Sequence, residues 1–150
     1  MGDVVPDFEL PDETGTTRSL SGLLAAGPVV LFFYPAAMTY GCTKESCHFR
    51  DLHTELSELG AQPVGISVDP VDKQKEFSET HGLGFPLLSD ADGEVANLMG
   101  VKRRWGPIPV RRTTFVIDTD RKVIGRFHNE LQMGAHADRA LELLRSRAGA

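Results

Sequence analysis

The sequence of 150 residues contains only two cysteines, Cys42 and Cys47, and a single tryptophan. So few cysteines exclude a small secreted domain that is held together by disulfides. Two close cysteines in an intracellular chain are more often redox-active or metal-binding than structural. A bridge between them would close a short loop and would restrict the unfolded chain little.

No apolar stretch is long enough to cross a membrane. The longest one, from Leu23 to Met38, is interrupted by Gly27, Pro28 and Pro35, whereas a spanning helix needs about 20 consecutive apolar residues. The first residues are rich in acids and contain no base, unlike a secretory signal. We therefore expect a cytoplasmic protein with no membrane partner.

The charge balance also excludes some partners. The net charge is −5, from 16 basic and 21 acidic residues, which argues against nucleic acid as the main partner. The bases between Lys102 and Arg112 surround Trp105, but a solvated loop explains them better than a nucleic-acid patch. Hydrophobic residues make up 41% of the chain, enough for the core of one domain over residues 1–150.

Short apolar runs alternate with helical patterns along the chain. The continuous run Val29–Tyr34, ended by Pro35, is typical of a central strand that is buried on both faces. Further strands are predicted at 63–68, 87–88, 113–117 and 123–127, with an edge hairpin over 4–15. Helices are predicted at 42–59, 71–81, 93–99 and 137–145. This alternation predicts an α/β sandwich.

Cys42 follows the loop between the central strand and the next helix. Thr39 suits the N-cap position and would place Cys42 in the first helical turn. Free backbone N–H groups and the positive end of the helix dipole favour a thiolate there. From position alone, a nucleophilic cysteine and a small core cysteine are about equally well supported.

A helical wheel separates the two cysteines. Glu45 and the apolar residues of 49–59 fall on the side of Cys42, whereas Cys47 lies about 140° away and is expected to face outward. In an unbroken helix their Cα atoms would be about 8.6 Å apart, beyond the limit of about 7 Å for a disulfide. A bond between them therefore requires the first turns to unwind, which indicates a redox cycle rather than a static crosslink.

The segment around the cysteines resembles that of the peroxiredoxins. Their signature Pro-x-x-x-Thr-x-x-Cys is matched by Pro35, Thr39 and Cys42, and the acid three residues later by Glu45. A second cysteine five residues after the first, here Cys47, marks the peroxiredoxin Q or bacterioferritin comigratory protein subfamily.

The resemblance covers nearly the whole chain in the right order, including segments 7–12, 41–51, 86–90 and 112–118. One departure is Tyr40, which stands where the subfamily commonly has proline and other peroxiredoxin classes accept an aromatic residue. The resemblance implies a thioredoxin-like α/β sandwich with a central mixed sheet that is flanked by helices.

The resemblance also implies a thiol-dependent peroxidase that reduces hydrogen peroxide and organic hydroperoxides. Cys42 would be the attacking thiolate, and Thr39 would hydrogen-bond both the peroxide and the sulfur. Arg112 would stabilise the thiolate and the charge that builds on the peroxide oxygens. Pro35 would shield the site from water, and Glu45 would orient Arg112.

The second half of the implied cycle involves Cys47. It would condense with the sulfenic acid on Cys42, and thioredoxin or a similar dithiol protein would reduce the disulfide by attack on Cys47. No metal, haem or flavin is needed. The preferred peroxide, the reductant and the choice between monomer and homodimer stay open.

Three rival interpretations are weaker. A zinc site built from Cys42, Cys47, His48 and His53 would need two cysteines that face apart on one helix. A thioredoxin-like disulfide oxidoreductase would need a Cys-x-x-Cys motif, which the chain lacks. A non-catalytic thioredoxin-fold binding domain would keep the fold without turnover.

Overall fold

The computed structural model describes the chain except for residues 1–2, 36–39, 103–109, 129–134 and 149–150. The elements are β1 (Glu9–Pro11), β2 (Thr17–Ser19), α1 (Leu20–Leu24), β3 (Val29–Phe33), α2 (Tyr40–Asp51), α3 (His53–Glu58), β4 (Gln62–Ser67), α4 (Val71–His81), β5 (Leu87–Ser89), α5 (Glu94–Leu98), β6 (Thr113–Ile117), β7 (Val123–His128) and α6 (Ala135–Ala148). None of the described helices is both long enough and apolar enough to span a membrane.

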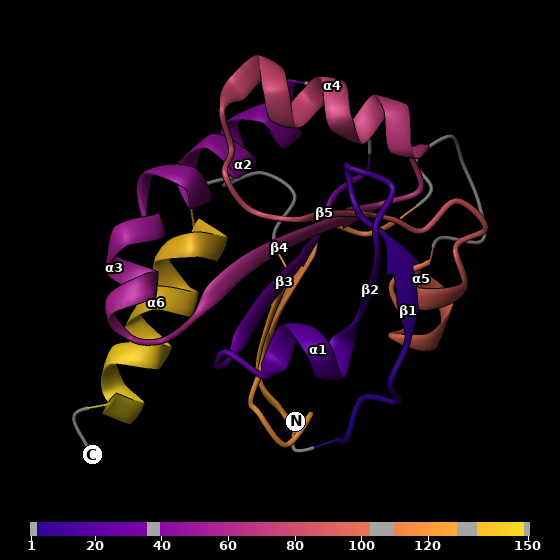
Figure 1. Ribbon diagram of the computed structural model, residues 1–150. Helices are drawn as coiled ribbons and strands as arrows, with labels where there is room; N and C mark the ends of the chain where they lie inside the picture. Colours follow the sequence, from indigo (N-terminus) through magenta and orange to yellow (C-terminus); the bar gives the residue numbers. More distant parts are fainter. Residues whose placement is uncertain (1–2, 36–39, 103–109, 129–134, 149–150) are drawn as a thin grey trace.

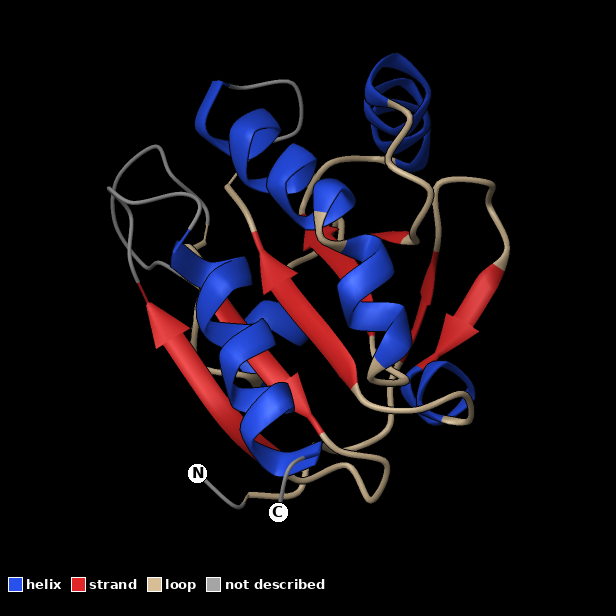
Figure 2. Ribbon diagram, turned by 90° about the vertical axis from the view of Figure 1, so that its left-hand side faces the viewer, coloured by secondary structure: helices blue, strands red, loops and turns tan. Residues whose placement is uncertain are grey.

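The five-stranded central sheet has the order β5-β4-β3-β6-β7. Figure 2 shows the strands in red with helices packed over them. β3 runs parallel to β4 and antiparallel to β6, so the sheet is mixed, as the resemblance implies. All five residues of β3 are buried, which confirms the central strand that the apolar run predicts. A strand with neighbours on both edges and helices over both faces has no side that contacts water.

Successive side chains of β3 point to opposite faces of the sheet and belong to two separate cores. Val29, Leu31 and Phe33 pack in one core with α1 and α5. Val30 and Phe32 pack in the other core with α2, α3, α4 and α6. Figure 1 shows the same division, with α1 and α5 on one side of the sheet and α2, α3 and α6 on the other.

The N-terminal hairpin forms later in the chain than predicted. The pairing joins Glu9–Pro11 to Thr17–Ser19, whereas the prediction placed the hairpin over 4–15. The turn forms around the Asp12 carboxylate, which accepts hydrogen bonds from Thr14, Thr16 and Arg18. The turn therefore lies after Asp12, between the two strands, because the buried Asp12 carboxylate binds three of the residues that follow it.

The predicted helix over 42–59 is two helices, α2 and α3. α2 already begins at Tyr40, and the break falls at Leu52, whose φ and ψ are −93° and 6°. Backbone bonds from Leu52 N to His48 O (3.1 Å) and from Leu56 N to Leu52 O (3.0 Å) continue across the break. The two helices therefore keep their apolar residues on one face, and Gly60 follows at a positive φ of 74°.

The remaining predictions agree closely with the structure. α4 and β6 have the predicted bounds, and β4, β5, β7, α5 and α6 differ by up to three residues at their ends. The short helix α1 was not predicted. α4 ends where Gly82 adopts the left-handed conformation with φ 55°, a common way to end a helix.

Candidate active site

The predicted strand before Cys42 and the helix that contains it are present. Tyr34 directly follows β3, Pro35 is half-buried, and α2 begins at Tyr40. Cys42 therefore lies in the first turn of α2, where the helix dipole favours a negative charge. Thr39 lies outside the described residues.

For two further candidate residues, Cys42 and Glu45, the structure describes only the backbone, which lies within α2. Their contacts with Arg112 or with one another therefore stay predictions. Their backbone positions nevertheless place both residues in the first two turns of the helix that follows the Pro35 loop.

Arg112 lies at the same end of the sheet as this loop. Phe33, the last residue of β3, pairs with Thr113, the first residue of β6. Because these strands are antiparallel, the next position in the register places Arg112 opposite Tyr34. The Arg112 side chain is buried, with 6% exposure. A permanent cation thus lies beside the start of the loop, although more than 70 positions separate the two in the sequence.

A buried polar network lies next to the loop. The Tyr34 hydroxyl donates to Gln74 Oε1, and Gln74 Nε2 donates to Ser67 Oγ (3.0 Å) and to the carbonyl oxygen of Leu88 (2.8 Å). Ser67 Oγ in turn donates to Asp69 Oδ2 at 2.7 Å. The network joins the carboxyl ends of β3, β4 and β5, where ligands of α/β sheets bind.

The sequence analysis missed this network, although a signal for it exists. Gln74 lies three residues before Phe77 and so shares its helix face, and both side chains are fully buried. A polar residue at an apolar position of a helix needs a partner inside the protein. Tyr34, which ends the apolar run Val29–Tyr34, supplies one.

Three consecutive residues attach the second half of α2 to the rest of the protein. His48 Nε2 lies 2.8 Å from Asp138 Oδ1 of α6, and Arg50 Nη1 donates to the carbonyl oxygen of His81 at 2.7 Å. Between them, Phe49 is fully buried against the sheet. His48 is thus engaged with α6, and the described residues contain no cluster of three metal-ligating side chains.

The prediction that Cys47 faces outward is wrong. Cys47 is half-buried and packs against the core between the sheet and α2. The reason is α6, which packs against α2 and places Ala137, Ala140 and Leu141 in the same core. The preceding residue, Ser46, is fully buried, and its Oγ has no hydrogen-bond partner among the described residues.

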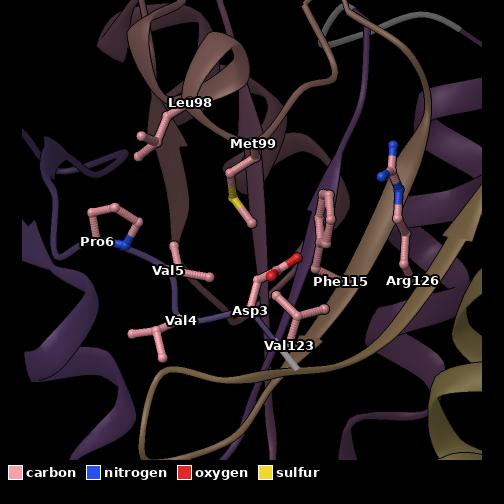
Figure 3. Close-up of a pocket in the computed structure, with 9 residues that line it drawn as sticks. All are labelled: Asp3, Val4, Val5, Pro6, Leu98, Met99, Phe115, Val123 and Arg126. Atoms are coloured by element: carbon pink, nitrogen blue, oxygen red, sulfur yellow. The ribbon is translucent and has the colours of Figure 1, made fainter. Parts of the chain in front are cut away.

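A separate hollow of about 160 Å³ lies on the other face of the sheet (Figure 3). Its lining includes Val4 and Leu98, which are about half-exposed. The charged residues in it are Asp3 and Arg126, and the Arg126 guanidinium lies 5.5 Å from the centre of the Phe115 ring. Because α2 lies on the opposite face, this hollow is not part of the candidate site.

The fold, with Cys42 in the first turn of the helix that follows the central strand, is that of a thioredoxin-like thiol peroxidase. Residues 1–126 match the AhpC/TSA family. The chain belongs to this family and is a peroxiredoxin, which is a thiol peroxidase.

Within the family the chain is similar to peroxiredoxin Q and bacterioferritin comigratory proteins. The crystal structure of peroxidoxin BcpB from Mycobacterium tuberculosis is 62% identical, with a TM-score of 0.93 over 97% of this chain and 96% of that one. Chloroplastic peroxiredoxin Q of Populus jackii is 40% identical over 97% of this chain and 68% of its own. The bacterioferritin comigratory protein of Xanthomonas campestris is 29% identical, with a TM-score of 0.85 over 94% and 92% of the two chains.

Proposed function

We propose that the protein reduces hydrogen peroxide and organic hydroperoxides with the Cys42 thiolate. The observation that carries the proposal is the location of Cys42 in the first turn of α2, after a loop that starts opposite the buried Arg112. The Xanthomonas campestris relative was studied for alkyl peroxide reduction, which supports organic hydroperoxides as substrates.

In the first step the thiolate attacks the terminal peroxide oxygen. The O–O bond breaks, the other oxygen leaves with a proton as water or an alcohol, and Cys42 becomes a sulfenic acid. Thr39 hydrogen-bonds the peroxide, and Arg112 stabilises the charge on the departing oxygen. Pro35 shields the site from water and Glu45 orients Arg112.

In the second step the Cys47 thiol attacks the sulfenic sulfur, a disulfide forms and water leaves. The two Cα atoms are too far apart for this bond in an intact helix, so the start of α2 unwinds first. Cys47, half-buried in the folded helix, then leaves the core. Thioredoxin or a similar dithiol protein attacks its exposed sulfur and restores both thiols.

This cycle needs only residues of one chain, acting as a single domain over 1–150. It is compatible with both a monomer and a homodimer. The proposal requires no metal or organic cofactor, because both electrons that reduce the peroxide come from the cysteine sulfur.

Two single variants test the proposal. Cys42→Ser should abolish peroxide consumption, because the attacking sulfur is lost. Cys47→Ser should keep one round of peroxide reduction, measured as one sulfenic acid trapped per chain, and should lose turnover with thioredoxin. Peroxide turnover that persists in Cys42→Ser would refute the assignment of Cys42. Unchanged turnover with thioredoxin in Cys47→Ser would refute the role of Cys47.

A further inference from the structure

Ser46 lies one residue before Cys47 and is fully buried within α2. Its hydroxyl oxygen has no hydrogen-bond partner among the described residues. A hydroxyl that is removed from water without a partner destabilises the folded form, because the unfolded form hydrates it. The Ser46 hydroxyl therefore destabilises only the state in which α2 is wound and packed.

The contacts of α2 indicate where unwinding stops. His48, Phe49 and Arg50 are held by α6, by β3 and by the end of α4 respectively. Ser46 and Cys47 pack against the core, but no hydrogen bond or ring contact of their side chains to another element is seen in the described part of the chain. The segment that can unwind without loss of these anchors is therefore 40–47, which contains both cysteines and Ser46.

We infer that Ser46 shifts α2 toward the unwound form in which Cys47 reaches Cys42, and thereby sets the rate of disulfide formation. The inference rests on the proposed function and adds a regulating residue to it. Ser46 does not touch the peroxide; it acts through the position of Cys47. Water hydrates its hydroxyl once the segment 40–47 unwinds, so unwinding removes a destabilising feature of the folded site.

The same shift decides between two fates of the sulfenic acid on Cys42. In the unwound form it condenses with the Cys47 thiol, forming the disulfide and releasing water. In the wound form it stays at the start of α2, away from the Cys47 thiol, where a second hydroperoxide oxidises it to a sulfinic acid, the O–O bond breaking and water or an alcohol leaving. A wound form that is more stable therefore gives slower disulfide formation and more sulfinic acid.

The test is Ser46→Ala, with Ser57→Ala as the matched control. Ser57 is an exposed residue of α3, so its replacement brings the same gain in helix propensity outside the segment that unwinds. The reduced proteins are mixed with one equivalent of hydrogen peroxide and quenched with an alkylating reagent. Mass spectrometry then follows the sulfenic acid and the disulfide separately with time.

We expect Ser46→Ala to form the sulfenic acid at the wild-type rate and the disulfide about fivefold to tenfold more slowly, as the removal of an unsatisfied hydroxyl implies. Its sulfinic acid yield in excess peroxide should rise, and the amides of 42–47 should exchange hydrogen more slowly. Ser57→Ala should stay within about twofold of wild type.

The outcomes separate this inference from the proposed function. If no sulfenic acid forms on Cys42 in any of the proteins, the proposed function itself fails. If sulfenic acid forms normally but Ser46→Ala makes the disulfide as fast as Ser57→Ala, or faster, the role of Ser46 is overturned and the function stands.

Discussion

The ring of Phe49 in α2 lies stacked on the ring of Phe32 in β3, with centroids 4.3 Å apart and planes 13° from parallel. Both rings are fully buried. This stack joins the helix that carries both cysteines to the central strand of the sheet. Phe49 lies only two residues beyond Cys47, so the stack fixes the part of α2 next to the segment that unwinds in the proposed cycle.

Replacing Phe49 with alanine should strongly destabilise the protein. The loss of a buried phenyl ring and the cavity that remains cost about 3–5 kcal/mol of unfolding free energy. Phe49→Leu keeps an apolar side chain of similar volume and should cost less than about 1.5 kcal/mol. Urea denaturation followed by circular dichroism measures both values. Equal losses in the two variants would contradict the importance of this packing.

Arg112→Lys should slow the reaction with peroxide. Lysine keeps the positive charge but loses the planar array of donors, and the loss of one such donor typically costs about 10²–10³-fold in rate. The rate constant is measured by competition with a reference peroxidase, and the fraction of thiolate by ultraviolet absorbance titration. Arg111→Lys is the control, since Arg111 is exposed one position away and should react at the wild-type rate. A wild-type rate in Arg112→Lys would exclude this residue from the site.

Gln74→Leu should destabilise the carboxyl ends of three strands. The variant leaves the carbonyl oxygen of Leu88 without the Gln74 donor and removes one of the two hydrogen bonds that Ser67 Oγ accepts, the other coming from the Asp69 backbone N–H. A buried group left unsatisfied costs about 1–3 kcal/mol. A double-mutant cycle with Tyr34→Phe isolates the bond between the Tyr34 hydroxyl and Gln74. We expect a coupling energy of about 0.5–3 kcal/mol, as for residues in one network. Strictly additive effects in urea denaturation would show that the two side chains act independently.

Asp12 should make stability depend on pH. Burial raises the pKa of its carboxyl, but hydrogen bonds from Thr14, Arg18 and Thr16 outweigh this effect and lower the pKa below its ordinary value. The carboxylate therefore contributes stability above the unfolded-state pKa of about 3.9, and this stability is lost as the pH falls through the lower folded-state pKa.

Asp12→Asn should accordingly lose about 1.5–3 kcal/mol at pH 7, the usual contribution of hydrogen bonds to a charged group. The difference from wild type should shrink as the pH falls below about 4. Unfolding free energies measured in urea between neutral and acidic pH check this. Glu58→Gln, at an exposed carboxyl of α3, should follow the wild-type curve. A constant difference in unfolding free energy between Asp12→Asn and wild type at all pH values would contradict the role of the Asp12 carboxylate.

Hydrophobic periodicity was sufficient for most of the fold. The apolar run Val29–Tyr34 predicts the central strand because burial on both faces leaves no polar position in it. The break at Leu52 could not be predicted, since no glycine or proline marks it. The shifted hairpin depends on the Asp12 side chain, whose hydrogen bonds appear only in three dimensions.

The candidate site was predictable where it is local and less so where distant segments meet. Cys42 at the helix start follows from the sequence around it. The place of Arg112 depends on the register between β3 and β6, which residue patterns alone do not specify. The partial burial of the Cys47 side chain depends on α6, which lies about 90 positions further along the chain.

The register between β3 and β6 places the cation at the end of the central sheet, whereas the nucleophile lies on a helix whose described side-chain hydrogen bonds to other elements begin at His48. In the proposed cycle, each turnover therefore separates the two groups that reduced the peroxide. The Cys42 sulfur moves when the helix unwinds, and the Arg112 guanidinium stays in place. An oxidised molecule cannot engage another peroxide until a dithiol lets the helix wind again. Reduction of the disulfide is thus required before the protein can react with the next peroxide molecule.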